Sequence, residues 1–320
     1  MRLLITGGCG FIGHNVIKYA RSSHRIDMVI NVDRLDSNSH NSAYFTQSTD
    51  TYHFEHLDLA HDIAQTKLVE LMTRFNVTHV LHLAALSHVD DSFTSPAKYI
   101  QANIIGTFNL IEACRAIKLV QFIYTSTDEI YGDPINYAGE NAPLYPSNPY
   151  AATKAAGDML VQSYAHSFGL PAMIIRPNNI FGPGQDTTKV IPKFIQLAQA
   201  GTPLTISGDG SQTRNFLHVD DFIDALFILL LDRYTWCGTC PIYNINSTDE
   251  ISIIDLATLI WSIIHPSPPQ ITFITDRPYN DKHYHITAEP IRALGWVQKC
   301  NMTDKLIELI GRPALPEPPA

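Results

Sequence analysis

The sequence predicts an α/β fold in which a doubly wound parallel sheet is followed by a smaller α/β domain. Three observations point to it. Short apolar runs alternate with helical patterns through the first half of the 320 residues, and this order gives βαβ units and a parallel sheet. A glycine-rich turn directly follows the first apolar run. After Pro177 the alternation gives way to loops rich in glycine and proline.

The elements of the sheet follow from six apolar runs. The candidate strands are residues 2–6, 28–33, 53–58, 79–83, 122–126 and 172–176, and the helical patterns between them lie near 13–22, 62–75, 97–117 and 150–168. Strands separated in this way by helices are typical of a doubly wound topology.

The second half predicts a different arrangement. Helices are expected near 189–200, 219–231 and 253–264, with brief strands at 204–207 and 242–245. We therefore expect residues 1–177 to form the large domain and residues 178–311 mainly the smaller α/β domain, with some segments returning to the large sheet. The tail 312–320 carries four prolines and cannot hold a helix.

Composition limits the possible partners. With a net charge of -9 and a pI near 5.8, the chain lacks the clustered basic residues of a nucleic-acid or anionic-membrane surface. The apolar run 222–231 contains Asp224 and is too short to span a bilayer. We expect no nucleic acid, no membrane, and a soluble protein of the cytoplasm.

Cysteine and histidine spacing gives little sign of metal chemistry. The five cysteines are scattered over a long chain, unlike a disulfide framework. Cys237 and Cys240 have C-x-x-C spacing, and they are either two free thiols in a loop or a redox or metal pair. The 14 histidines show no ligand spacing, so the sequence predicts no metal.

The glycine-rich turn has the spacing of a dinucleotide-binding fingerprint. In Thr6-Gly7-Gly8-Cys9-Gly10-Phe11-Ile12-Gly13, Gly7 permits a tight turn, Gly10 lets the backbone approach a diphosphate, and Gly13 allows close packing of the helix that Phe11 and Ile12 open. The helix N-terminus then holds the diphosphate without a basic surface. The sequence therefore predicts a Rossmann domain.

Two acidic positions indicate which dinucleotide binds. Asp33 ends the second strand about 20 residues beyond Gly13, where an acid binds the ribose hydroxyls and repels a 2′-phosphate, so NAD is favoured. Arg34 is the residue that leaves NADP open. Asp58 and Leu59 close the third strand and are expected at the adenine, although Asp58 is also compatible with a plain turn.

A tyrosine and a lysine share one face of a predicted helix. Tyr150 and Lys154 follow Asn148-Pro149, where proline marks the helix start, and the i, i+4 spacing brings their side chains together. We expect the ammonium and a nicotinamide cation to lower the pKa of Tyr150 below about 10 and make it a base. The plainer alternative is a packed tyrosine and a solvated lysine.

Two adjacent acids leave the fifth strand at its carboxyl end. Thr127, Asp128 and Glu129 emerge where open α/β sheets bind ligands. Two carboxyl groups at such a place can divide acid and base work if their environments separate their pKa values. A solvated acidic turn is the alternative.

These segments together resemble the extended short-chain dehydrogenase/reductase superfamily, and within it the dTDP-glucose and UDP-glucose 4,6-dehydratases. The likeness covers nearly the whole chain. Its segments are the glycine turn, Ala84 to Asp90, Ser126 to Glu129, Asn148 to Tyr150, Arg176 to Asn179, Val190 to Phe194, Gly208 to Phe216 and Asp276 to Asp281. The Thr-Asp-Glu triplet is the specific part, since related epimerases and decarboxylases usually carry Ser or Ser-Glu in its place.

The resemblance implies a lyase that removes water from a nucleotide-linked glucose. Tyr150, aided by Lys154 and Thr127, takes the proton of the 4-hydroxyl while NAD accepts the hydride from C4. Glu129 removes the C5 proton and Asp128 protonates the departing 6-hydroxyl. The hydride returns to C6, and the product is a 4-keto-6-deoxyglucose nucleotide, a precursor in deoxysugar synthesis.

The resemblance also implies the binding residues. Leu83, Ala84, Ala85, Tyr150, Lys154 and Asn179 join the cofactor set. The substrate set is Ser87, Thr127, Asn178, Lys189, Val190, Thr205, Ile206, Ser207, Arg214, Asp276 and Arg277. Arg214 and Arg277 suit a diphosphate because a guanidinium can bind it bidentately, although each is also compatible with a surface ion pair.

One position departs from the family pattern. Many dTDP-glucose enzymes carry Glu where this chain has Leu86, so a contact with the sugar hydroxyls is lost and UDP-glucose is as good a candidate as dTDP-glucose. A nucleotide-sugar 4-epimerase, a UDP-glucuronate decarboxylase and a non-catalytic NAD-binding regulator remain as alternatives. Relatives are usually homodimers, and helices near 97–117 and 150–168 could form the interface.

Overall fold

A seven-stranded parallel sheet forms the centre of the larger lobe. The computed structural model describes residues 1–37, 39–40, 42–133, 137–231 and 238–311. The strands run in the order β10-β6-β5-β4-β1-β2-β3, and every neighbouring pair is parallel. Their bounds are β1 (Arg2–Thr6), β2 (Met28–Asp33), β3 (Tyr52–His56), β4 (His79–His82), β5 (Gln121–Thr125), β6 (Ala172–Pro177) and β10 (Ile242–Ile245). The doubly wound fold predicted from the sequence is confirmed.

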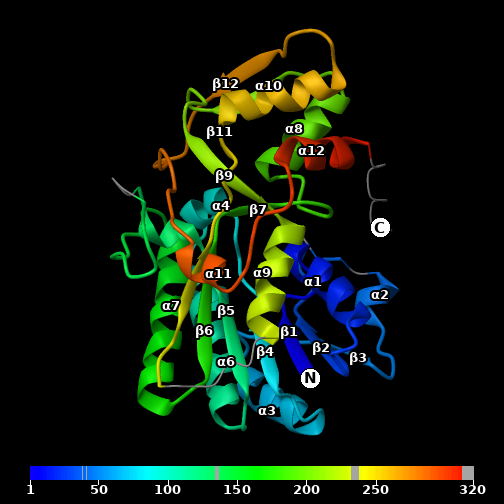
Figure 1. Ribbon diagram of the computed structural model, residues 1–320, viewed down its shortest axis with the longest axis vertical. Coiled ribbons are helices and arrows are strands. Elements are labelled where there is room, and N and C mark those ends of the chain that lie inside the picture. The colour runs from blue at the N-terminus through cyan, green and yellow to red at the C-terminus, as the bar shows by residue number, and fades with distance from the viewer. Residues whose placement is uncertain (38, 41, 134–136, 232–237, 312–320) are drawn as a thin grey trace.

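Helices cover both faces of this sheet, as Figure 1 shows. On one face lie α3 (Ala64–Arg74), α6 (Gly106–Arg115) and α7 (Pro149–Phe168), and on the other α1 (Phe11–Ser22), α9 (Val219–Leu231) and α11 (Glu289–Ala293). Strands covered on both sides are apolar throughout: all six residues of β2 are buried. Because helices cover both faces of the sheet, a ligand can reach it only at an edge, such as the carboxyl ends of the strands.

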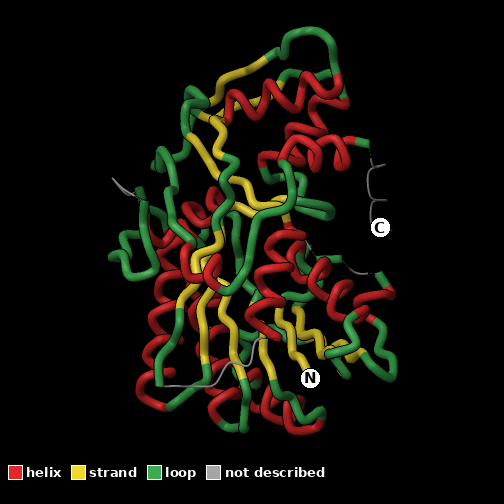
Figure 2. Tube along the Cα trace, in the orientation of Figure 1, coloured by secondary structure: helices red, strands yellow, loops and turns green. Residues whose placement is uncertain are grey.

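The second lobe lies beyond that edge, at the top of Figure 2. It has its own apolar core. Its elements are α8 (Val190–Gln199), α10 (Ile253–Ile264) and α12 (Met302–Ile310), with β7 (Asn179–Phe181), β8 (Leu204–Ser207), β9 (Thr213–His218), β11 (Glu250–Ser252) and β12 (Ile271–Ile274). The strands pair as β11-β9-β7 and β12-β8.

The chain does not divide at residue 177. After forming β9 in the second lobe it returns through α9 to the large core, and β10 then pairs with β6 in register from Ile242 opposite Ile174. It leaves again for β11 and comes back at α11, which packs beside β10. The two lobes are therefore interleaved rather than consecutive. Cys237 and the tail 312–320 lie outside the described residues.

The expected helix over 97–117 is interrupted. The chain forms α4 (Val89–Thr94), α5 (Pro96–Tyr99), a π-helical turn η1 (Ile100–Ile105) and then α6. Such π turns are frequent at functional sites, and in η1 the Asn103 side chain bonds both the loop after β4 and α7. Two further short helices are α2 (Ala43–Thr46) and the 3₁₀ turn η2 (Asp128–Tyr131).

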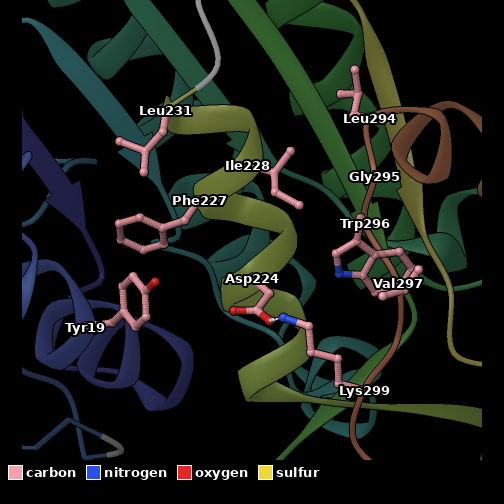
Figure 3. Close-up of a pocket in the computed structure, with 10 residues that line it drawn as sticks. All are labelled: Tyr19, Asp224, Phe227, Ile228, Leu231, Leu294, Gly295, Trp296, Val297 and Lys299. Atoms are coloured by element: carbon pink, nitrogen blue, oxygen red, sulfur yellow. Dashed lines mark hydrogen bonds and ion pairs between the residues drawn. The ribbon is translucent and has the colours of Figure 1, made fainter.

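A surface cavity of 530 Å³ lies between α1, α9 and the segment after α11 (Figure 3). Tyr19 and Phe227 pack against each other at one side of it, with ring centroids 4.4 Å apart, and Lys299 pairs with Asp224 at 2.5 Å. It contains none of the residues predicted for the site. Within the described residues, no helix combines the length and apolarity needed to cross a bilayer.

Candidate active site

The glycine turn has the backbone that its spacing predicts. Gly7 has a φ of +71°, and a Cβ there would come within 2.7 Å of the backbone of Ala84. A Cβ on Gly13 would lie 2.2 Å from the carbonyl oxygen of Gly7. Gly10 is the N-cap of α1, with no side chain over the helix end. The open N-terminus of α1 therefore forms a cradle for a diphosphate, and Phe11 and Ile12 pack its first turn into the core.

Asp33 lies directly beside this turn. One carboxylate oxygen accepts a hydrogen bond from the Cys9 amide at 2.9 Å and the other from the Leu35 amide at 2.8 Å. Burial raises the pKa of Asp33, and these amide bonds oppose the rise. The carboxylate is thus fixed at the end of β2. Oδ1 also accepts the Ser39 hydroxyl at 3.3 Å, so Oδ2 is the oxygen with a second lone pair for a ribose hydroxyl.

The residues next to Asp33 are engaged with their neighbours. Arg34 pairs with Asp36 at 2.9 Å, which weakens it as a 2′-phosphate ligand. Asp58 accepts a hydrogen bond from the Ala60 amide at 2.9 Å, as in the plain turn that the sequence left open. Leu59 is buried against Gly106. Arg34 and Asp58 both line a cavity of 620 Å³ that also includes Leu86.

Unpartnered polar atoms at the strand ends complete the fit to a dinucleotide. The Ser126 hydroxyl and the Asn179 side-chain oxygen are buried and have no hydrogen-bond partner among the described residues. Leu83 and Ala84 lie against Gly7, and Ala85 precedes Leu86 in the same loop. Buried polar groups need partners, so these atoms, the cradle and Asp33 suit NAD. The NAD expected from the sequence is confirmed by solved relatives that contain it, described below.

Tyr150 and Lys154 are both buried on α7, with exposed fractions of 8% and 4%. The Lys154 ammonium donates to the Thr125 carbonyl at 2.6 Å, and burial lowers its pKa to about 7. Burial also raises the pKa of Tyr150, and the nearby Glu129 charge adds to the rise, against a hydrogen bond from Thr127. The expected lowering of the Tyr150 pKa includes the charge of a bound nicotinamide, so it stays a prediction, while burial keeps the pKa high in the chain alone.

Asp128 and Glu129 begin η2 at the end of β5, buried beside Tyr150. Thr127 caps this turn by accepting the Glu129 amide at 3.3 Å. Burial and then the Glu129 charge raise the pKa of Asp128 to about 7, although Asn178 donates to its carboxylate at 2.6 Å. The sequence alternative of a solvated turn is excluded, since both side chains are less than one tenth exposed.

The environment of Glu129 differs from that of Asp128. Burial raises its pKa too, but the positive charges of Arg214, Lys189 and Arg277 oppose the rise, in that order. At neutral pH this favours a protonated Asp128 beside an ionised Glu129. The arrangement supplies one acid and one base within a single buried pocket next to a tyrosine.

Three cations therefore surround the acids from the second lobe. Lys189 is the N-cap of α8 and donates from Nζ to the Ser87 carbonyl at 2.7 Å. Arg277 lies 3.6 Å from Asp90, the surface ion pair that the sequence left open. Arg214 is buried in β9 and forms no ion pair with a described residue.

The other predicted substrate residues lie on α8, on β8 and in the segment after β12. Val190 opens α8, and Asp276 bonds the Arg277 amide at 2.9 Å. On β8, the Thr205 hydroxyl is buried and unpartnered among the described residues. The Ile206 side chain belongs to the core of the second lobe, and its backbone pairs with Phe273 of β12. The Ser207 carbonyl accepts Gln212 at 3.3 Å.

Sequence reasoning missed Asn148 as a site residue. It caps α7 by accepting the Ala151 amide at 2.8 Å, and its amide group donates to Glu129 at 3.3 Å. The Asn148-Pro149 pair predicts a helix start, but local sequence does not reveal that the capping side chain also contacts Glu129 in η2. The same holds for Asn103, which bonds Leu86 and Thr153 from the π turn.

One group of potential metal ligands occurs in the described residues, although the sequence predicts none. His218, Asp220 and Cys300 have ligand atoms within 4.8 Å of one another. Local bonds account for two of them, since the Asp220 amide donates to His218 Nδ1 at 3.3 Å and the Asp220 carboxylate lies 3.3 Å from the same nitrogen. Lys305 also lies 3.4 Å from the Asp220 carboxylate, so a cation is already present.

The sequence of this chain is similar to those of a known protein family. Residues 3–245 match the model of the NAD dependent epimerase/dehydratase family. The chain is 36% identical to the human dTDP-D-glucose 4,6-dehydratase over 93% of its own length and 85% of the relative. It is also 36% identical to the Arabidopsis thaliana trifunctional UDP-glucose 4,6-dehydratase/UDP-4-keto-6-deoxy-D-glucose 3,5-epimerase/UDP-4-keto-L-rhamnose-reductase RHM3, over 95% of its own length and 46% of the relative. The chain thus spans about half of that plant protein.

Solved structures of the same family have a similar fold. The dTDP-glucose 4,6-dehydratase DesIV from Streptomyces venezuelae, solved with NAD, has a TM-score of 0.88 and 28% identity, with 97% of this chain and 96% of that one covered. A UDP-glucuronic acid 4-epimerase from Bacillus cereus, in complex with UDP-glucuronic acid and NAD, has a TM-score of 0.87 and 26% identity over 97% and 99% of the two chains. Fold similarity alone therefore does not separate dehydratase from epimerase.

Proposed function

Because this chain belongs to the NAD dependent epimerase/dehydratase family, we propose that it is a nucleotide-sugar 4,6-dehydratase. As a hydro-lyase it converts dTDP-glucose or UDP-glucose to the 4-keto-6-deoxyglucose nucleotide and water. The observation that carries the proposal is the buried Asp128-Glu129 pair beside Tyr150, with its two carboxyl groups in different electrostatic environments. An epimerase has no need of a second acid that can protonate a leaving hydroxyl.

Each side chain has a role that its surroundings support. Tyr150 accepts the proton of the sugar 4-hydroxyl, oriented by Thr127 and with Lys154 beneath it on α7. Glu129 takes the C5 proton, since three cations favour its ionised form. Asp128, whose pKa is about 7, retains the proton that it passes to the departing 6-hydroxyl. The C5–H and C6–O bonds break, and the products are water and an alkene conjugated to the 4-ketone.

Bound NAD would supply hydride acceptance from C4 and hydride return to C6, together with a positive charge for Tyr150. Glu129 returns its proton to C5 as C6 is reduced, which completes the 4-keto-6-deoxy product. Gly7, Gly10 and Gly13 form the cradle for its diphosphate, and Asp33 binds the adenosine ribose. The raised pKa of Tyr150 in the chain alone makes this charge part of the proposal, because the phenol needs a nearby cation to act as a base near neutral pH.

The nucleotide of the substrate is dTDP or UDP. Relatives named for each are 36% identical to this chain, and Leu86 removes the acid that many dTDP-glucose enzymes carry. Lys189, Arg214 and Arg277 provide the positive charge for the diphosphate in a protein whose net charge is -9.

The test is incubation of the purified protein and NAD with each sugar nucleotide. We expect loss of one water by mass spectrometry and the alkaline absorbance of a 4-keto sugar. The substitution Tyr150→Phe should abolish both because it removes the proton acceptor, while the glycine cradle and Asp33 retain most of the NAD affinity. Formation of a galactose epimer alone would refute the proposal and favour the 4-epimerase alternative, which the Bacillus cereus structure keeps open.

We also propose a homodimer in the cytoplasm, as the sequence suggested. Large apolar side chains remain exposed on the helical layer formed by η1, α6 and α7, where the exposed fractions of Ile100, Phe108 and Met159 are 46%, 38% and 61%. A second copy that covers them would remove this surface from water.

A further inference from the structure

A buried arginine without an ion pair is the strongest sign of an anionic ligand in the second lobe. Arg214 is 8% exposed, and no carboxylate among the described residues lies within 4 Å of it, although its charge acts on Glu129 from farther away. A buried guanidinium needs a partner for its charge. The sugar nucleotide of the proposed function carries a diphosphate, which provides that charge.

The protein nevertheless occupies most of the guanidinium. Nη1 donates to the Thr213 carbonyl at 2.7 Å and to the Lys282 carbonyl at 3.3 Å, and Nη2 donates to the Asn280 side-chain oxygen at 3.0 Å. These bonds use three of the five N–H donors of an arginine. The two that remain are Nε–H and one Nη2–H, and the Nε–Nη2 edge of a guanidinium fits two oxygens of a single phosphate.

Two residues of the segment after β12 hold this orientation. Asn280 accepts from Arg214 and is itself fixed, because its amide group donates to Asp276 at 3.1 Å. The Tyr284 ring lies under the guanidinium, 4.5 Å from its carbon to the ring centroid. The Tyr284 hydroxyl donates to the buried Asp281 at 2.6 Å, and Ser147 donates to the same oxygen.

We infer that Asn280 and Tyr284 are positioning residues that turn one edge of Arg214 toward a phosphate and so set the preference for a nucleoside diphosphate. Neither residue needs to touch the substrate. This inference rests on the proposed function, because the phosphate belongs to the sugar nucleotide. The segment 280–284 thereby contributes to the selectivity for diphosphates without contacting them.

The test compares binding of UDP with UMP, and of dTDP with dTMP, by calorimetry on the full chain with NAD present. For Asn280→Ala we expect affinity for both diphosphates to fall about tenfold, the usual scale of a charge-assisted hydrogen bond, with the monophosphates affected less than about threefold. In the dehydratase assay KM should rise by a similar factor and kcat should change less than about twofold.

Tyr284 provides a matched pair of variants. Tyr284→Phe keeps the ring under Arg214 and should bind diphosphates within about twofold of the wild type, whereas Tyr284→Leu should lose about tenfold. Tyr279→Ala, at a half-exposed neighbour, is the control that should change nothing.

The outcomes separate the two claims. If the wild type binds neither UDP nor dTDP, the proposed function and this inference both fail. If the wild type binds them and Asn280→Ala binds them equally well, only the positioning role is overturned. Equal losses for monophosphates and diphosphates would also overturn it, since general damage to the lobe has that effect.

Discussion

Asn178 donates a hydrogen bond to Asp128 across 2.6 Å, and its own side-chain oxygen accepts the Ser247 amide at 2.9 Å. One amide therefore fixes the acid at the end of β5 from the end of β6. Even so, burial raises the pKa of Asp128 to about 7.

Replacement of Asp128 should separate the two half-reactions. In Asp128→Asn the oxidation at C4 retains Tyr150 and Lys154, but the 6-hydroxyl loses its acid, so elimination should slow by about 100-fold or more. Rapid-mixing absorbance at the NADH band should show reduced cofactor accumulating. Equal loss of both half-reactions would contradict the acid role.

The pH dependence of elimination should follow the same carboxyl group. Its pKa is raised, so the protonated form prevails below about pH 7 and is lost as the pH rises through that value. Between pH 6 and pH 8 the elimination rate should fall about tenfold, measured in single turnovers with trapped intermediates. A flat profile over this range would exclude Asp128 as the acid.

Breaking the buried pair of Arg176 and Asp158 should be strongly destabilising. Arg176 bonds both carboxylate oxygens of Asp158 at 2.9 Å, and it also donates to the Tyr131 hydroxyl at 2.6 Å. Arg176→Leu leaves Asp158 buried without its partner and should cost about 3–5 kcal/mol in the free energy of unfolding. In urea denaturation, Arg176→Leu/Asp158→Leu should lose less than the sum of the single variants, and additivity would speak against the pairing.

The glycine cradle predicts a specific loss of NAD binding. A Cβ at Gly13 would meet the Gly7 carbonyl oxygen at 2.2 Å, so Gly13→Ala should weaken NAD binding about tenfold or more by shifting the turn away from the diphosphate. Gly139→Ala is the matched control, because its Cβ meets only Thr287 at an ordinary 3.6 Å. Fluorescence titration should find NAD affinity unchanged in the control, and similar losses in both would point to a general effect.

The exposed apolar layer on α7 predicts the oligomeric state. Met159→Glu places a charge where the proposed second copy packs, and light scattering should detect a monomer about half the mass of the wild type. Leu294→Glu, on the segment after α11, is an exposed control that should leave the dimer intact. A monomeric wild type would rule out the dimer altogether.

Local sequence patterns predicted where the strands lie but not which strands pair with each other. The six runs match β1 to β6 within about two residues, because a strand buried on both faces has a recognisable composition. The run 242–245 was also expected as a strand, yet nothing local indicates that it pairs with β6. The same limit hid the π turn in the helix over 97–117, which forms where Asn103 meets residues far along the chain.

The sequence predicted which site residues lie together better than it predicted their pKa values, which depend on burial. The motifs brought Thr127, Asp128, Glu129 and Tyr150 together as expected. Burial raises the pKa of Tyr150 in the chain alone, and an i, i+4 spacing carries no information on this desolvation, so the expected lowering depends on the nicotinamide charge. Arg214 was expected at the substrate, but its supports Asn280 and Tyr284 come from a segment about 70 residues away.

The return of the chain to the large sheet at β10 also limits how the protein can be taken apart. No single cut separates the substrate-facing portion from the nucleotide-binding portion, so neither can be expressed or exchanged as a cassette. Several connecting segments join the two lobes, and a rotation of one lobe against the other must bend all of them at once. This favours small closing movements over a wide swing about one hinge.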